Sequence, residues 1–273
     1  MGNANSKQSK TPKGGTKMLP KILGIILAII LILIAMLFVI ASKNVKAMNR
    51  CVDTALNTLQ EYYTVNPIDV GEYKEMKINP MMRFHVEQYD IEEIGNLSVM
   101  RVNMGVMQMA TFVITPRDKN LPLLSADYMY ILGNRKSYLE FYDVVKEKDE
   151  QYTWLLNALS ETHQEFAYLE NVETSPAWYA HLLTVTAYKG GKTSDDKDLE
   201  SLLIDSLNVY LEHSKQFPLL SDEEKNEKLA ITVDYTDGLI QKGGISTDVF
   251  KKSLGDEATK IFFDNIFFGT AAN

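Results

Sequence analysis

Few residues of this chain are placed to carry out chemistry. The four histidines are scattered, with no pair at metal-ligand spacing on one element, so we expect surface or core histidines and no metal site. They are His85, His163, His181 and His213. Cys51 is the only cysteine, which excludes an intramolecular disulfide and a thiolate metal cluster. The glycine-rich nucleotide motifs, the nucleophile elbow G-x-S-x-G and the zinc motif H-E-x-x-H do not occur.

Asp127 is the carboxyl with the most suggestive surroundings, because an apolar strand, residues 128–132, follows it directly. Burial at the mouth of such a strand would raise its pKa and let it hold a proton near neutrality. An ordinary strand-end Asp bonded to backbone remains an equal alternative. Tyrosines on the predicted strands either pack a sheet face or form an aromatic wall for a flat ligand. They are Tyr128, Tyr130, Tyr138 and Tyr142.

The elements that position these residues change character along the chain. Five stretches read as strands, with Gly133-Asn134 as a tight turn and short connections that imply antiparallel pairing: 83–91, 97–103, 107–115, 127–132 and 137–145. Four later stretches carry helical periodicity: 152–169, 196–216, 223–240 and 247–268. Strands followed by helices predict an α+β domain with helices packed on an antiparallel sheet.

Residues 22–41 are twenty consecutive residues without a charge, enough for a helix of roughly 30 Å to cross a bilayer. The stretch is longer than a signal-peptide core and lacks a small-residue cleavage site, so we predict an uncleaved single-pass membrane anchor. An amphipathic helix over 44–63 continues from it. Five lysines precede the span and three basic residues follow it, which favours an N-terminus in the cytoplasm but leaves the side of the soluble domain open.

The charges divide sharply at the span. All 36 acidic residues follow residue 42, against 23 of the 28 basic ones, so the soluble part carries a net charge of −13. Such a domain would not bind a phosphate backbone, and nucleic-acid binding is not expected.

Two stretches, 111–145 and 235–269, resemble the ferredoxin-dependent bilin reductases. The first has a strand that ends in Pro116, then Leu121-Pro122 and Asp127, matching the family pattern L-P-x-x-x-x-D after a strand-ending proline. The second resembles the family's C-terminal helix with its aromatic end, here Phe267-Phe268-Gly269. The likeness extends over most of residues 80–269 in order and length.

The resemblance implies a three-layer α/β/α sandwich around a central antiparallel sheet, here preceded by one transmembrane helix. It implies a linear tetrapyrrole substrate between sheet and C-terminal helices, no bound organic cofactor, and single electrons from ferredoxin. Asp127 matches the family's proton-donating Asp, and Gln241 and Lys242 fall near its polar substrate contacts. Thr111 stands where the enzymes that make phycocyanobilin carry a His, and it cannot shuttle a proton at neutral pH.

We therefore expect a basic segment 1–21, a transmembrane helix 22–41, a juxtamembrane helix and connection 42–79, and a bilin-reductase-like domain 80–273. Three functions stay open at this stage. The chain is a membrane-anchored bilin reductase, or a tethered binding or structural module that keeps the fold without redox chemistry. The third is an extracytoplasmic interaction domain unrelated to tetrapyrroles.

Overall fold

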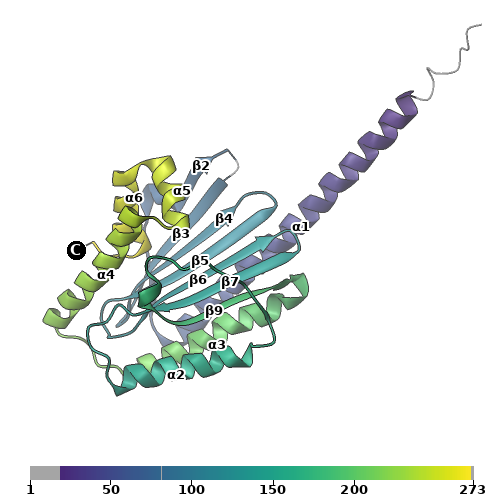
Figure 1. The fold of residues 1–273 in the computed structure, drawn as a ribbon. Coiled ribbons are helices and arrows are strands. Elements are labelled where there is room, and N and C mark those ends of the chain that lie inside the picture. Colours follow the sequence, from purple (N-terminus) through teal and green to yellow (C-terminus); the bar gives the residue numbers. More distant parts are fainter. Residues whose placement is uncertain (1–18, 81, 272–273) are drawn as a thin grey trace, which may run out of the picture.

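The computed structural model describes residues 19–80 and 82–271. Most of the basic segment 1–21 lies outside the described residues. Within them, nine strands form one antiparallel sheet flanked by helices, so the α+β class expected from the sequence is confirmed (Figure 1).

The N-terminal helix α1, Leu19–Tyr62, is a single continuous helix. Its first half projects away from the domain and exposes apolar side chains such as Leu23 and Phe38 (Figure 1). It is long and apolar enough to cross a membrane, a criterion that a signal sequence near the N-terminus also meets. Its second half packs against the sheet and α3, so residues 44–63 continue the apolar helix without a break.

The sheet has the strand order β1-β3-β4-β5-β6-β7-β9-β8, with β2 also paired to β3. The strands are β1 Val65–Ile68, β2 Glu75–Asn79, β3 Met82–Ile91, β4 Gly95–Asn103, β5 Met107–Pro116, β6 Leu123–Ile131, β7 Asn134–Tyr142, β8 Glu170–Asn171 and β9 Leu183–Lys192. All five expected strands are present. β1, β2, β8 and β9 were not expected, and the first two add residues from the 42–79 connection to the sheet.

The turn between β6 and β7 lies one residue earlier than expected. Ile131 pairs with Asn134, so the two turn residues are Leu132 and Gly133. Leu132 takes the positive φ, 54°, that glycine or asparagine more often adopts.

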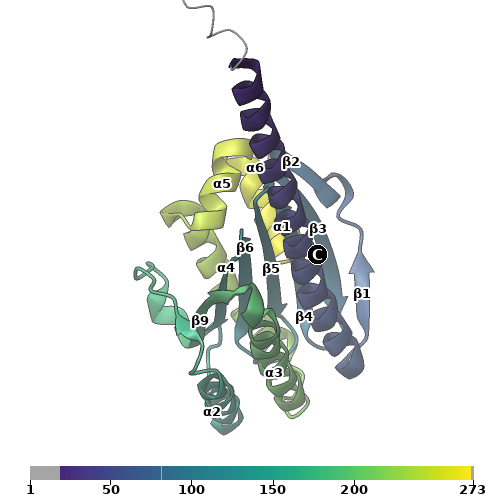
Figure 2. The same cartoon turned by 90° about the vertical axis from the view of Figure 1, so that its right-hand side faces the viewer.

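Helices cover the two faces of the sheet separately (Figure 2). On one face, α1, α2 Glu150–Glu165 and α3 Asp196–Ser214 enclose a core that includes Leu59, Phe112 and Tyr210. On the other, α4 Asp222–Lys242, α5 Ile245–Leu254 and α6 Asp256–Phe262 enclose a core rich in phenylalanine.

The C-terminal helix is broken where a single helix over 247–268 was expected. Gly255 ends α5 with a φ of 85°, and α6 begins at the next residue and passes into a π-helical turn, Phe263–Phe267. Gly243, with a φ of 88°, ends α4. The two breaks fold the chain back so that its aromatic end packs on the sheet.

Lys228 of α4 forms buried hydrogen bonds with the segments that flank β6 and β7. Its ammonium group is buried and donates to the carbonyls of Leu121 at 2.7 Å and Val144 at 3.3 Å. Burial lowers the pKa of Lys228 from 10.5 to about 7, partly opposed by the charge of Asp143.

This burial predicts a pH dependence of stability. Because the folded-state pKa lies below the unfolded value, the unfolded chain binds more protons between pH 7 and 10.5, and stability from this group rises with pH across that window. We expect the free energy of unfolding of the wild type, relative to Lys228→Met, to rise by about 2–4 kcal/mol from pH 7 to 10. Denaturation of the full chain in detergent micelles, followed by tryptophan fluorescence, measures this difference.

Lys225→Met is the matched control, because Lys225 lies on the same helix and forms a partly exposed ion pair with Asp118. The difference in free energy of unfolding between this control and the wild type should not change from pH 7 to 10. If the difference in free energy of unfolding between the wild type and Lys228→Met did not change with pH, the lowered pKa of Lys228 would be contradicted.

Candidate functional site

Asp127 lies in the middle of β6 rather than at its mouth. The strand begins at Leu123, four residues earlier than expected, because the apolar pair Leu123-Leu124 is already part of the ladder. Asp127 pairs with Thr111 on β5 and with Tyr138 on β7, and Tyr138 in turn pairs with Tyr188 on β9. Four polar side chains therefore form one row across four strands.

Strand alternation places this row on the face covered by α4–α6. Along β6, Tyr128 and Tyr130 point to the opposite face and are buried in the α1–α3 core. Leu123 lies on the Asp127 face and joins the α4–α6 core. The sequence named four tyrosines together, and the sheet separates them: Tyr138 and Tyr142 share the Asp127 face.

Asp127 is a half-buried residue, and its carboxyl accepts a hydrogen bond from the buried Thr111 hydroxyl, with 2.5 Å between Oγ1 and Oδ1. Burial raises the pKa of Asp127 from 3.8 to about 6, the hydrogen bond from Thr111 opposes the rise, and the charge of Glu140 adds to it. The group thus changes protonation near neutrality.

Glu140 organises the tyrosines beside Asp127. It accepts hydrogen bonds from the hydroxyls of Tyr142 and, at 2.7 Å, Tyr188. Burial, together with Glu140, raises the pKa of both tyrosines above the usual value of 10, which keeps them protonated donors. Neither Glu140 nor Tyr188 was singled out from the sequence, although the alternation of β7 places Glu140 on the same face as Tyr138.

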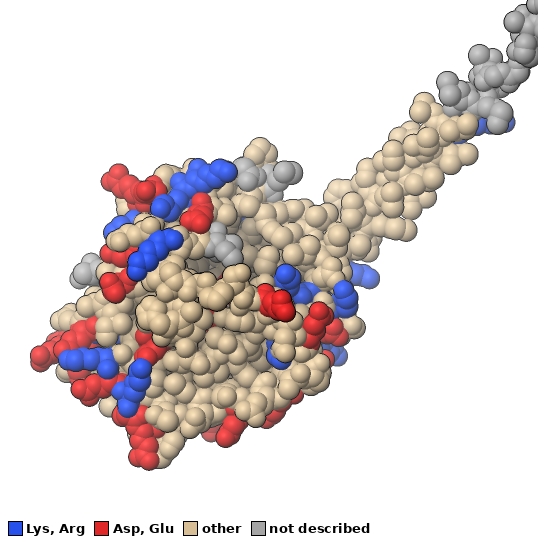
Figure 3. Space-filling view, in the orientation of Figure 1, with Lys and Arg blue, Asp and Glu red and all other residues tan. Residues whose placement is uncertain are grey.

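The sheet surface around the row is half-covered. Met109, Met129, Tyr138 and Tyr188 are each partly exposed on this face. Figure 3 shows that uncharged side chains make up the middle of the face, with charged ones gathered toward its margins. The surface offers flat aromatic and thioether contacts beside two carboxyls, Asp127 and Glu140.

An aromatic cluster borders this surface on the α4 side. Tyr235 of α4 packs against Tyr142 with ring centroids 5.0 Å apart and against Tyr179 at 5.9 Å. Trp178 lies against Gly238, where an added Cβ would come within 2.2 Å of the indole, so only glycine fits. Asp127 and Glu140 both contribute to raising the pKa of Tyr179, after burial, which places the cluster within electrostatic reach of the site.

Gln241 and Lys242 lie at the end of α4 and are exposed. The ammonium group of Lys242 lies 4.6 Å from the ring centroid of Trp178, a cation–π contact on the outer side of the aromatic cluster. The structure thus brings Lys242 to the border of the Asp127 surface, whereas no contact of Gln241 with that surface is described.

One cavity lies away from Asp127. It measures about 350 Å³ at the end of α1 and is lined by Tyr62, Tyr63, Thr64, Glu92, Glu93, Lys119 and Lys215. A much smaller crevice of about 20 Å³ lies near Asn96 and Thr270. Asp127 lines neither of these two cavities.

The remaining titratable residues are held in structural contacts. Cys51 is buried on α1, and burial raises the pKa of its thiol to about 12, which makes it unreactive. His163 is buried beside Ser206, and burial lowers its pKa to about 4. Within residues 19–80 and 82–271, no group of three or more His, Cys, Asp or Glu is placed to hold a metal ion.

Comparison with known proteins rests on structure alone. No protein-family model matches the chain, and no curated protein matches it by sequence. Among solved structures it is similar to phytochromobilin synthase from tomato, crystallised in complex with biliverdin. The TM-score is 0.68, the identity is 12%, and the match covers 81% of this chain and 83% of the other. The predicted resemblance to the ferredoxin-dependent bilin reductases is therefore confirmed for the fold.

Asp127→Asn should make the protein more stable at pH 7. The folded-state pKa lies above the unfolded one, so the stability that Asp127 contributes is complete below pH 3.8 and is lost as pH rises to about 6. The full shift corresponds to at most about 3 kcal/mol, and partial exposure lowers this to an expected gain of about 1–2 kcal/mol. Denaturation at pH 4 and pH 7 tests it, and the gain should vanish at the lower pH.

Asp90→Asn serves as the control, since Asp90 forms a partly exposed ion pair with Arg117 at 3.0 Å. This control substitution should lower the free energy of unfolding slightly, or leave it unchanged, at pH 7. An Asp127→Asn variant that behaves like this control would show that Asp127 has an ordinary pKa.

Proposed function

We propose that this protein is a membrane-anchored, bilin-reductase-like protein that binds a linear tetrapyrrole across the Asp127 face and reduces it with electrons from ferredoxin. The observation that carries the proposal is a partly buried carboxyl with a pKa of about 6, at the centre of the sheet, in a fold shared with a biliverdin-binding enzyme. A flat conjugated ligand suits a face built from Tyr138, Tyr188 and two methionines.

Asp127 is the proposed proton donor. Reduction of one double bond takes up two electrons and two protons, and a carboxyl that titrates near neutrality can supply a proton to a ligand stacked over the sheet. The hydroxyl oxygens of Tyr142 and Tyr188, whose protons are donated to Glu140, can accept hydrogen bonds from N–H groups of the ligand. Lys242, over the Trp178 ring, would pair with a propionate of such a ligand.

A second function, binding without reduction, is favoured by Thr111. Its hydroxyl is engaged as a donor to Asp127 and cannot act as an acid at neutral pH, so Asp127 has no titrating partner on the adjacent strand. The protein would then hold the tetrapyrrole as a carrier or sensor.

Biliverdin titration of the full chain in detergent micelles tests the shared part of both functions. We expect the visible absorption band to shift to the red at micromolar protein. The shift should be lost in Asp127→Asn, which cannot protonate the ligand, and kept in the control Asp90→Asn. Absence of any spectral change with wild-type protein would contradict tetrapyrrole binding.

Anaerobic incubation of the same complex with reduced ferredoxin separates the two functions. Reduction predicts loss of the biliverdin band in the wild type, more slowly as pH rises above about 6, where Asp127 loses its proton. Binding alone predicts a band that persists, together with gain of reduction in Thr111→His, which restores a titrating partner opposite Asp127.

The membrane anchor is proposed from α1. Its apolar half is exposed along its whole length, whereas its second half carries core residues, so the division of the helix matches a span followed by a domain. We expect the intact chain, with its N-terminus uncleaved by mass spectrometry, to stay in membranes after carbonate extraction. A mature chain that begins near residue 42 would identify a signal sequence instead.

A further inference from the structure

Two apolar hairpin tips lie together at the end of the sheet from which the apolar half of α1 departs. Val106, between β4 and β5, is 43% exposed, and Leu132, between β6 and β7, is 39% exposed. The backbone N–H of Leu132 donates to the carbonyl of Val106 at 3.1 Å, so the two turns form one surface.

The backbone of Leu132 does not explain the choice of a large apolar side chain. A φ of 54° favours glycine or asparagine, and an exposed leucine there gains little from packing within the domain. An apolar residue held at such a position points to a contact outside the folded domain.

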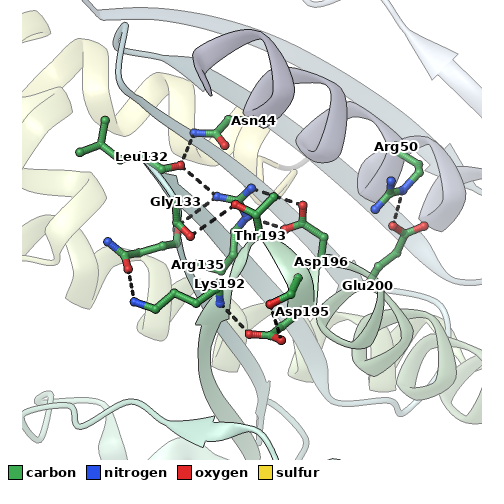
Figure 4. A network of polar contacts seen from close by, with 12 residues as sticks. Asn44, Arg50, Leu132, Gly133, Arg135, Lys192, Thr193, Asp195, Asp196 and Glu200 are labelled. Atoms are coloured by element: carbon green, nitrogen blue, oxygen red, sulfur yellow. Dashed lines mark hydrogen bonds and ion pairs between the residues drawn. The ribbon is translucent and has the colours of Figure 1, made fainter. Parts of the chain in front are cut away.

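A hydrogen bond between the Leu132 turn and α1 fixes how far this surface lies from the proposed membrane span. Asn44 is buried and donates from Nδ2 to the carbonyl of Leu132 at 3.0 Å (Figure 4). Asn44 follows the last residue of the uncharged stretch, Ala41, by three positions, an axial rise of about 4.5 Å. The polar headgroup layer of one leaflet is roughly 5–8 Å thick, so the tips lie at its depth when residues 22–41 span the hydrocarbon.

The tips are held rigidly at this place. Arg135 is buried, forms an ion pair with Asp196 of α3 at 2.5 Å, and donates to the carbonyl of Leu132 at 3.3 Å. Thr193 donates its backbone N–H to the carbonyl of Gly133 at 3.1 Å. Figure 4 shows α1, the turn and the start of α3 joined by these contacts.

Four exposed lysines lie on the elements next to the apolar tips, together with Asp196, which is paired with Arg135, and Asp195, which accepts from the backbone of Lys192. Lys43 and Lys46 follow the span on α1, Lys136 lies on β7 past the turn, and Lys192 bonds to Asn134 beside it. Apolar tips with lysines next to them are complementary to a bilayer surface, where the tips enter the interface and the ammonium groups meet lipid phosphates.

We propose that this surface, made of Val106 and Leu132 with the lysines next to them, docks on the headgroup layer of the bilayer that α1 crosses. The lipid surface holds the sheet end-on, with its hairpin tips against the membrane. This inference rests on the membrane anchor proposed above and not on tetrapyrrole binding.

Site-directed fluorescence quenching on the full chain tests the docking surface. In a Cys51→Ser background, an environment-sensitive probe is attached to Leu132→Cys or to Leu219→Cys. Leu219 is the matched control, an exposed leucine that bridges to Lys119 beyond the far end of β5, roughly 30 Å away along the strand. The chain is reconstituted in vesicles of phosphatidylcholine and phosphatidylglycerol that contain doxyl-labelled lipid.

We expect the probe at position 132 to be blue-shifted and quenched at least about twofold more strongly than the probe at 219. Equal quenching at both positions in carbonate-resistant chains would overturn the docking surface and leave the anchor intact. If carbonate extracted the chain from the membrane, both the docking surface and the membrane anchor would be contradicted.

A second variant guards against disturbance by the probe itself. Leu132→Asn with Val106→Ser keeps a residue that tolerates the positive φ and removes the apolar tips. A probe at Lys136→Cys should then lose its quenching, whereas Leu219→Asn should leave it unchanged. Unchanged quenching in the double variant would contradict insertion of the tips.

Discussion

The continuity of α1 is the constraint on which the rest of the arrangement depends. One helix carries the exposed apolar stretch and, from Ala47 onward, side chains of the domain core such as Val52, Ala55 and Leu59. Each large apolar side chain buried in this way contributes roughly 1.5–3 kcal/mol, so the second half of the helix cannot detach cheaply. Because no flexible linker separates the two halves, the direction of the apolar stretch determines the orientation of the sheet.

The row of paired residues that contains Asp127 runs from a part of the sheet covered by helices to a part that is only half-covered. The row begins at Val86 and Met100, which are buried under the C-terminal helices, and passes through Thr111 to the partly exposed Asp127, Tyr138 and Tyr188. Asp127 therefore stands at the boundary between the covered and the half-covered part of one sheet face. Burial raises its pKa.

Local patterns predicted much of the fold. Alternation and helical periodicity located five strands and the main helices. The exposed β1, β2 and β9 were missed because edge and near-edge strands have weak alternation: β9 contains two adjacent glycines and several exposed residues. The split at Gly255 was missed because helical periodicity persists across it.

The site was predictable only in part. The motif around Pro116 and Asp127 located the carboxyl, and counting back along the strand placed Thr111 opposite it, as the register shows. Tyr188, Tyr179 and Trp178 come from a segment whose approach to α4 depends on long-range packing against Gly238 and Tyr235, for which the sequence has no local signal. Glu140 could have been found from strand alternation alone, once its hydrogen-bonding role was considered.

The electrostatics of this arrangement restrict how an electron donor can approach. The lysines nearest the span would face lipid phosphates, so the surface left to solvent is still more acidic than the domain's net charge of −13. An acidic donor such as ferredoxin would meet repulsion over most of that surface, including the part of the sheet face that carries Asp127 and Glu140. Asp127 lies five residues along β6 from Leu132, about 17 Å along the strand from the proposed bilayer surface. An acidic donor would thus gain no favourable charge contact at the site where the tetrapyrrole is proposed to bind.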